Sequence, residues 1–219
     1  MKVGRLLLRA TVGGFFIGHG TQKLFGLFGG EGLKGTAAGF HAMGLKPGNV
    51  NALAAGIAET AGGAGVALGY QTPFASAALV SVMATAINRV HLKNGPWAHK
   101  GGYEYNAVLL AAAVALAESG PGALSLDALR GKQREGAGWG LVALGLGAAG
   151  AAGAHFFIEQ KSVAAATDAA SHNGTGDAAA VSTEAPTEVH EPVNGNGVAE
   201  PVEPVAETEA ADADADAEA

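Results

Sequence analysis

The sequence predicts an all-α membrane protein, with an antiparallel four-helix transmembrane bundle, a fifth transmembrane helix and a disordered acidic C-terminal tail. Three observations lead to this prediction. The 219 residues are 48% hydrophobic and only 15% charged, whereas a soluble domain carries about 25% charged residues. Five apolar runs lie within residues 1–160. Those residues hold 12 of the 13 Lys and Arg but only 7 of the 20 Asp and Glu, so a basic body precedes an acidic tail at residues 161–219.

Most of the apolar runs are long enough for a membrane-spanning helix, because roughly 20 residues at 1.5 Å per residue cross about 30 Å of hydrocarbon. A soluble Ala/Gly-rich helical protein is the alternative, but the five runs leave too little polar sequence to coat one. The predicted helices cover Leu6–Phe28, Val50–Tyr70, Pro73–Leu92, Tyr103–Ser119 and Ala137–Phe157.

The first run begins like a signal peptide, since Lys2 and Arg5 precede an apolar stretch. Arg9 interrupts that stretch, however, and no small-residue cleavage site follows it. A retained helix is therefore expected at the N-terminus.

Capping and helix-breaking residues lie between the runs. Thr72-Pro73 predicts an N-cap followed by Pro at the first helical position, so the second and third runs should form a helical hairpin. Gly120-Pro121-Gly122 predicts the end of the fourth run. The predicted divisions are the four-helix bundle at residues 1–128, a loop with the fifth helix at 129–160, and the tail at 161–219.

The tail contains no aromatic residue and is dominated by Ala, Glu, Asp, Pro, Thr and Val. Such a segment buries too little apolar surface to offset the entropy lost on ordering. We expect it to be disordered, either as a solvated extension or as a docking arm for a basic partner.

Composition also excludes several kinds of site. The chain has no Cys, which rules out disulfides, thiolate-ligated zinc and iron–sulfur clusters. A haem needs two His at matching depth, and His19 is central in its run whereas His91 and His155 lie at the ends of theirs. No metal or haem site is therefore predicted. The many glycines are interpreted as packing residues, and nothing indicates nucleic-acid binding.

Charged side chains deep in the apolar runs are the candidates for function, because each costs about 2.5–3.5 kcal/mol at mid-bilayer. His19 and Glu59 lie near the centres of the first and second runs, and Lys23 lies about 9 Å from the centre. His19 and Lys23 are four residues apart and share a helix face. That face should point into the bundle, with Glu59 or Glu104 within reach of Lys23.

The charged and polar residues in the apolar runs can also have purely structural roles instead of functional ones. Lys23 and Arg9 can snorkel to the headgroups, Glu59 can form a purely structural ion pair with Lys23, and His19 can be a satisfied core residue. Because successive spans cross the membrane in opposite directions, the end of the third run and the start of the fourth lie on the same side as Lys23. That side therefore also collects Arg89, Glu104 and Asn106. The candidate substrate-binding residues are His19, Lys23, Glu59, Arg89, Glu104 and Asn106.

Short motifs along the chain resemble a known family. Gly18-His-Gly-Thr-Gln-Lys23-Leu-Phe-Gly26 is similar to the Gly-x-x-Lys-Leu signature of the DoxX family of small integral membrane proteins. The other similar motifs are Glu59-Thr-Ala-Gly-Gly63, Leu68-Gly69 with Thr72-Pro73, Gly102-Tyr-Glu-Tyr-Asn106, Gly120-Pro-Gly122 and Ser125-Leu-Asp127. The resemblance covers about residues 5–128 and says nothing of the fifth run or the tail.

The resemblance implies a four-helix bundle that crosses the plasma membrane (the bacterial inner membrane) several times. It also implies a link to membrane redox chemistry, including a subunit of thiosulfate:quinone oxidoreductase, and to oxidative-stress complexes. It assigns no reaction to this chain, so whether the chain is an enzyme stays open.

Three functions are compatible with these residues. The first is a redox-associated membrane subunit that binds a quinone or similar small molecule, because a cation and a carboxylate in low dielectric can hydrogen-bond a quinone carbonyl and move its protons. No covalently bound cofactor is predicted, so electrons would come from a soluble redox partner protein. The second is a non-enzymatic scaffold that anchors such partners. The third is a small proton-coupled transporter that uses Glu59.

Overall fold

The computed structural model describes residues 3–173, while residues 1–2 and 174–219 lie outside the described part of the chain. Every regular element within the described residues is helical, which confirms the all-α prediction. The longer helices are α1 (Val3–Phe25), α2 (Gly32–Ala42), α3 (Gly48–Leu68), α4 (Thr72–Ala86), α5 (Glu104–Ser119) and α7 (Ala137–Asn173). The short elements are η1 (Leu27–Gly29), the π-helical η2 (Ile87–His91), η3 (Leu92–Asn94), η4 (Ala98–Lys100) and α6 (Leu126–Leu129).

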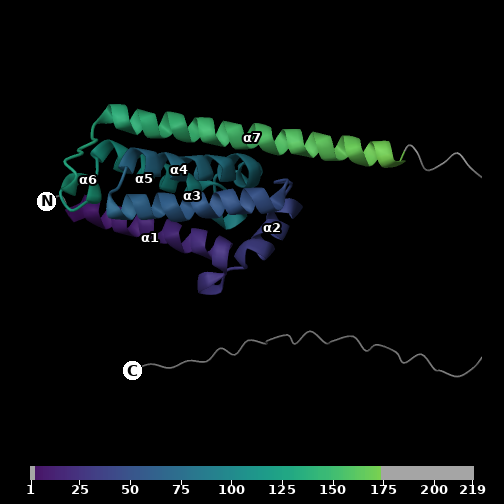
Figure 1. The fold of residues 1–219 in the computed structure, drawn as a ribbon, viewed down its shortest axis with the longest axis horizontal. Coiled ribbons are helices and arrows are strands. Elements are labelled where there is room, and N and C mark those ends of the chain that lie inside the picture. The colour runs from purple at the N-terminus through teal and green to yellow at the C-terminus, as the bar shows by residue number, and fades with distance from the viewer. Residues whose placement is uncertain (1–2, 174–219) are drawn as a thin grey trace, which may run out of the picture. The chain divides into compact units, whose positions relative to one another are not determined.

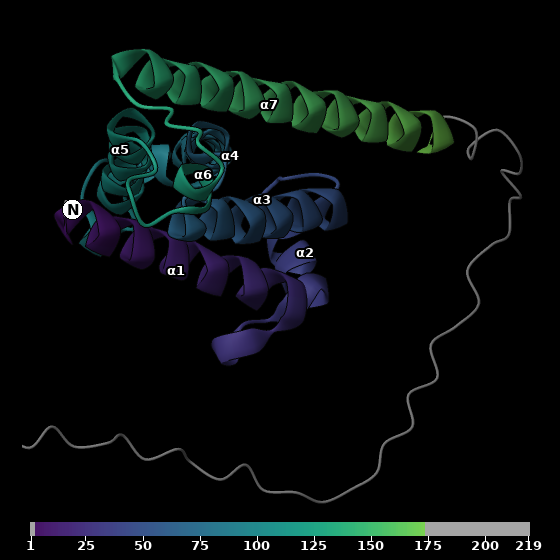
Figure 2. The same ribbon diagram turned by 60° about the vertical axis from the view of Figure 1, so that its left-hand side comes forward.

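Helices that are far apart in the sequence pack side by side. Helix α1 packs along α3, α3 against α4, and α4 against α5, which also contacts α1. Helix α7 lies along α4 and α5, on the side away from α1 (Figures 1 and 2). Helix α2 contacts α1 and α3 at the end where α1 finishes, which we call the α2 end. At the opposite end, called the Arg9 end below, α1, α4 and α7 begin.

Glycines let α1 and α3 approach until their backbones touch. A Cβ atom on Gly13 would lie 2.6 Å from the Gly63 carbonyl oxygen, and one on Gly63 would lie 2.7 Å from the Gly13 carbonyl oxygen. Further along the same contact, a Cβ atom on Gly20 would lie 2.7 Å from the Gly56 carbonyl oxygen. Because any side chain at these positions would overlap the neighbouring helix, glycine sets the distance between α1 and α3.

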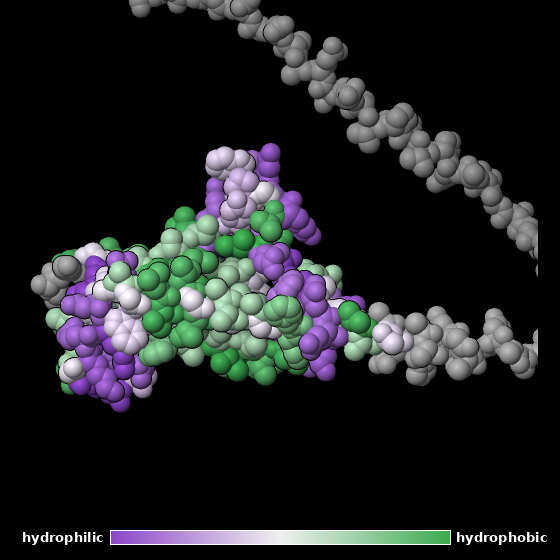
Figure 3. Space-filling view, turned by 90° about the horizontal axis from the view of Figure 1, so that it is seen from above, coloured by the Kyte–Doolittle hydropathy of each residue, from purple (hydrophilic) through white to green (hydrophobic). Residues whose placement is uncertain are grey.

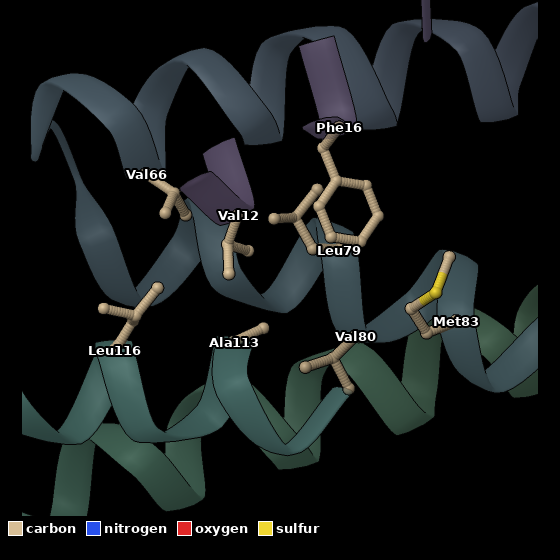
Figure 4. Packing of buried hydrophobic residues seen from close by; sticks show 8 residues of the cluster. All are labelled: Val12, Phe16, Val66, Leu79, Val80, Met83, Ala113 and Leu116. Carbon is tan, nitrogen blue, oxygen red and sulfur yellow. The ribbon is translucent and has the colours of Figure 1, made fainter. Parts of the chain in front are cut away.

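The buried apolar core lies where α1, α3, α4 and α5 meet (Figure 4). Most of its side chains are small or branched, and Phe16 fills the remaining space between α1 and α4. The core residues are Val12, Phe16, Val66, Leu79, Val80, Met83, Ala113 and Leu116. Their burial holds together the helices that surround the candidate site.

Arg9 is buried at the Arg9 end of the helices, with 2% of its surface exposed. Its guanidinium donates to the carbonyl oxygens of Val66 at 3.0 Å and Ala67 at 2.8 Å, in the last turn of α3. It also donates to the carbonyl oxygens of Pro121 and, at 2.9 Å, Leu124, between α5 and α6. The interpretation that Arg9 snorkels is wrong, because carbonyls at the end of a helix lack α-helical partners and accept from the guanidinium within the protein.

The start of α4 differs from the prediction at Thr72. Helix α4 begins at Thr72 itself, and Gln71 occupies the N-cap position in a left-handed conformation without a side-chain capping bond. The reason is a distant side chain, since the Asp127 carboxylate accepts from the Thr72 backbone N–H at 3.5 Å. The predicted hairpin is confirmed, because α3 ends at a left-handed Gly69 and packs against α4.

Helix α2 has no counterpart among the predicted elements. It lies between the first two apolar runs and contains Gly32, Gly35 and Gly39 among its 11 residues. Because glycine lowers helix propensity, this segment gives no clear helical signal in the sequence. The structure nevertheless packs it against α3, where it closes one side of the candidate site.

Helix α7 continues beyond the predicted start of the tail. The helix reaches Asn173, so the prediction of disorder is wrong for residues 161–173. The physical reason is continuity, since neither Gly nor Pro occurs between Ala154 and Asn173 and Ala is a strong helix former. The rest of the predicted tail, residues 174–219, lies outside the described residues.

The surface carries many large apolar side chains. An apolar zone lies between polar ends on the face seen in Figure 3. Two stretches of the described chain, Thr72–Asn94 and Ala137–Ala164, are long and apolar enough by length and composition to cross a membrane. Helices α1 and α3 have 23 and 21 residues but fall outside these two stretches. Helix α5 has 16 residues, so the other three predicted spans remain predictions.

We expect Gly13→Ala to destabilise the protein, because the new methyl group would overlap the backbone of α3 at Gly63. Overpacking of this kind costs about 1–3 kcal/mol. Gly14→Ala is the matched control, since a Cβ atom there meets nothing within 4 Å and the gain in helix propensity is the same. Thermal unfolding in detergent measures the difference, and equal midpoints for the two variants would contradict the close approach of α1 and α3.

We expect Arg9→Met to destabilise the protein more than Arg9→Lys. Methionine leaves four carbonyl oxygens without the guanidinium, and the bonds to two of them, Val66 and Pro121, are buried. Each buried polar group that loses its partner costs about 1–3 kcal/mol. Lysine keeps the charge and up to three donors, so it should retain part of the stability. The midpoint of thermal unfolding ranks the variants, and a Met variant as stable as the unsubstituted protein would contradict the role of Arg9.

Candidate functional site

A cavity of about 510 Å³ lies between the helices, in the half of the molecule nearer the α2 end. All six longer helices and the π-helical η2 contribute to its wall, including α2 with Phe40 and α7 with Ala154. Most of the lining is apolar, as at Phe16 and Leu109. The polar side chains of the lining are His19, Lys23, Asn51, Glu59, Ser81, Thr85, His91, Tyr105 and Asn106. Its volume is in the range of small-molecule sites, about 300–1,000 Å³.

An ion pair between Lys23 and Glu59 forms the charged part of the cavity wall. Lys23 Nζ lies 2.6 Å from Glu59 Oε2, and the two side chains are 23% and 4% exposed. The glycine contact between α1 and α3 places the two helices close enough for this bond. A carboxylate buried to this degree needs a charged partner to offset its desolvation. The structure therefore pairs Lys23 with Glu59, one of the two partners predicted.

His19 and Asn106 also line the cavity. His19 shares a face of α1 with Lys23, and its carbonyl oxygen lies 3.4 Å from Lys23 Nζ. Its ring is exposed, with Nδ1 3.2 Å from Gln22 Oε1. Asn106 is buried on α5, and its amide nitrogen lies 3.5 Å from the Met83 sulfur. The cavity thus brings together four of the predicted site residues, two of which are charged.

Arg89 is absent from the cavity wall and contacts α7 instead. Its Nη2 donates to the His155 carbonyl oxygen at 3.1 Å, and its Nη1 lies 3.6 Å from Glu159 Oε1. Arg89 lies in the π-helical segment η2, while Val90 and His91 of the same segment line the cavity. Arg89 therefore holds α7 against the cavity rather than facing it.

Glu104 is likewise absent from the cavity wall. Its Oε1 accepts from the backbone N–H of Ala98 at 2.9 Å, so the carboxylate holds the loop that precedes α5. The prediction offered Glu59 and Glu104 as alternative partners of Lys23. The difference arises because Glu104 is in the first turn of α5, where its carboxylate turns to the Ala98 N–H of the preceding loop.

Several lining residues were not predicted from the sequence. Ser81 and Thr85 lie on α4, and Thr85 Oγ1 donates to the Ser81 carbonyl oxygen at 2.8 Å. Asn51 donates to the carbonyl oxygens of Leu45 and Pro47 at 3.3 and 2.9 Å, which fixes the start of α3. Neutral polar residues such as these carry little cost in an apolar run. Helical periodicity, which places Ser81 and Thr85 on one face, is the signal that could have found them.

The described residues contain no group of three or more His, Cys, Asp or Glu side chains arranged to hold a metal ion. The cavity has two His in its wall, but its two charged side chains are already paired with each other. Its polar groups are suited to hydrogen-bonding an uncharged ligand. Lys23 supplies donors, Glu59 an acceptor, and Asn106 both.

The family model of DoxX matches residues 4–92, from the start of α1 through α4 and η2. No curated protein matches the chain, and no solved structure does. The matched region contains Lys23 and Glu59, whereas α5 and α7 lie beyond it. The resemblance stated from the sequence is thereby confirmed over its first part, and residues 4–92 of the chain are a DoxX domain.

Proposed function

We propose that the protein crosses the membrane several times and binds a small, mostly apolar molecule in the cavity, with a quinone as the favoured class. The observation that carries this proposal is the Lys23–Glu59 ion pair in the wall of an otherwise mostly apolar cavity. Family membership supports a membrane location and a loose link to redox or stress chemistry. In this proposal α1, α3, α4 and α5 form the transmembrane bundle, and α7 is a fifth span in the plasma membrane.

Exposed apolar side chains support the proposed spans. Large apolar residues are exposed on the outer faces of α1, α3, α4, α5 and α7, as at Phe15, Ile57 and Leu141. Monomeric soluble proteins rarely expose so much contiguous apolar surface. Hydrocarbon chains of a bilayer would cover these faces.

The positions of the Trp and Tyr residues also support helices that cross a bilayer lying between the α2 end and the Arg9 end. Tyr70 follows the end of α3 and Trp139 lies in the first turn of α7, so both are at the Arg9 end. Trp97, Tyr103 and Tyr105 lie just before or at the start of α5, at the opposite end. These five residues are all the Trp and Tyr of the chain. Trp and Tyr concentrate at the two interfaces of a membrane, so their positions fit a bilayer between the two ends.

A quinone fits the chemistry of the cavity wall. Its ring and chain are apolar, like most of the lining, and its carbonyl oxygens accept hydrogen bonds. The Lys23 ammonium can donate to one carbonyl, and the Asn106 amide can donate to the other. Reduction to the quinol takes up two electrons and two protons, and Glu59 and Lys23 are positioned to pass protons. In this proposal the electrons come from a soluble redox partner protein.

We expect the purified protein in lipid nanodiscs to bind short-chain ubiquinone or menaquinone analogues. Lys23→Met and Glu59→Gln should each weaken that binding at least tenfold, as measured by mass spectrometry of the intact complex. Glu104→Gln is the matched control, because Glu104 carries the same carboxylate but lies outside the cavity wall. Absence of quinone binding together with solute accumulation by the protein in proteoliposomes would instead support a proton-coupled transporter.

The same variants test whether the ion pair stabilises the fold. Lys23→Met leaves Glu59 as an unpaired buried carboxylate, which costs about 3–5 kcal/mol in a fully buried site. The partial exposure of Lys23 should reduce that cost. We expect a lower thermal midpoint for Lys23→Met and a partial recovery when Glu59→Gln is added. A double variant less stable than both single variants would contradict the coupling.

Helix α7 offers a test of the cavity volume. Ala154 lines the cavity, whereas Ala152 is exposed on the outer side of the same helix. Ala154→Leu should fill part of the space and weaken quinone binding, while Ala152→Leu should leave it unchanged. Quinone affinity measured in nanodiscs distinguishes them, and equal affinities for the two variants would mean that the ligand does not reach α7.

A further inference from the structure

The connection between α5 and α7, residues 120–136, exposes large apolar side chains at the Arg9 end of the helices. Leu124, Leu126 and Leu129 are 57%, 40% and 83% exposed. They lie on and beside the short helix α6, outside the part of the chain that the DoxX model matches. Neither the cavity nor the proposed quinone site uses them.

The exposure of these leucines is fixed by the fold. The backbone N–H of Asp127 donates to the Gly69 carbonyl oxygen at 3.0 Å, which ties α6 to the turn between α3 and α4. Ser125 Oγ accepts from the Ala128 N–H at 3.1 Å and caps α6. The Arg9 guanidinium donates to the Leu124 carbonyl oxygen. Two bonds to other elements and one local cap thus hold the backbone in the position that leaves the leucine side chains exposed.

The same connection carries cations that lie beside aromatic rings of neighbouring segments. The Arg130 guanidinium lies over the Tyr70 ring, 4.9 Å from its centroid. The Arg134 guanidinium lies 5.8 Å from the ring centroids of both Phe74 and Trp139. Lys132 is exposed between these two arginines. Cations beside aromatic rings, next to exposed leucines, are the chemistry of a segment at a membrane interface.

The acidic residues of the connection leave this basic face largely uncompensated. Asp127 is buried, with its carboxylate turned to the Thr72 N–H and to Arg134 Nη1 at 3.7 Å. Glu135 is exposed, and it is the second acidic residue of residues 120–136. Arg130 and Lys132 therefore outnumber Glu135 on the exposed side of the connection.

We propose that residues 120–136 form a docking site for anionic phospholipids, with the three leucines at the acyl-chain boundary and Arg130 and Lys132 on the headgroup phosphates. Each cation near an anionic surface strengthens binding by about fivefold at moderate salt. Salt screens this attraction, since the charges lie at the water interface. The site selects lipid by charge and is separate from the cavity.

Quenching of Trp139 by brominated lipids tests the proposal on the full chain. Trp97→Phe leaves Trp139 as the single Trp, because the chain has two. This protein is placed in bilayers of phosphatidylcholine and phosphatidylglycerol, in which either lipid carries bromine on its acyl chains. We expect phosphatidylglycerol to quench Trp139 severalfold more, at equal mole fraction, and high salt to reduce the difference.

Charge variants locate the site. Arg130→Gln with Lys132→Gln should abolish the preference for phosphatidylglycerol, and Glu135→Gln should increase it. Lys93→Gln with Lys100→Gln removes two exposed cations at the α2 end and should change nothing. Equal quenching by the two lipids, or a preference that survives loss of Arg130 and Lys132, would overturn the proposal. If neither lipid quenches Trp139, the connection lies in water and the proposal is also wrong. An acidic protein would then be the partner that its cations fit.

Discussion

The close contact between α1 and α3 is the constraint on which the rest of the structure depends. Gly13 and Gly63 face each other without side chains, so the two helix backbones touch. This contact brings the Lys23 ammonium to 2.6 Å from the Glu59 carboxylate. A wider spacing would leave a buried carboxylate without its cation. The two charges are thus tolerated inside the helices because glycine removes the side chains that would separate them.

The remaining helices build the cavity around that pair. Helices α4 and α5 close two sides through the core, α2 adds Phe40, and α7 adds Ala154. Arg89 fixes α7 in place through the His155 carbonyl oxygen and Glu159. The DoxX domain therefore supplies the charged wall, whereas part of the apolar wall comes from residues beyond it. Asn106 on α5 adds a polar group from beyond the DoxX domain, so both parts of the chain build the cavity wall.

The sequence predicted those features that depend on position along a helix. Depth and charge indicated that Lys23 meets Glu59 or Glu104, because a lone charge at mid-membrane is costly; the structure selects Glu59. Helix α2 gave no such signal, since its glycines weaken the helical pattern. The partners of Arg9 are backbone carbonyls, which every sequence contains, so no residue pattern points to them. Arg89 and Glu104 were expected at the site because of their side of the membrane, but their contacts depend on α7 and a loop.

The contacts of Arg9 have a consequence for how the protein is made. Arg9 lies in α1, which is synthesised before the other described helices, yet two of its acceptors, the carbonyls of Pro121 and Leu124, are synthesised more than 100 residues later. Until then the guanidinium has at most the carbonyls of α3 as partners. In the proposed transmembrane bundle, an early α1 must keep this charge near water or the translocation machinery. Helix α1 can therefore reach its final packed position only after the residues that follow α5 have been made. Assembly of the proposed bundle is then a late step that involves several helices at once.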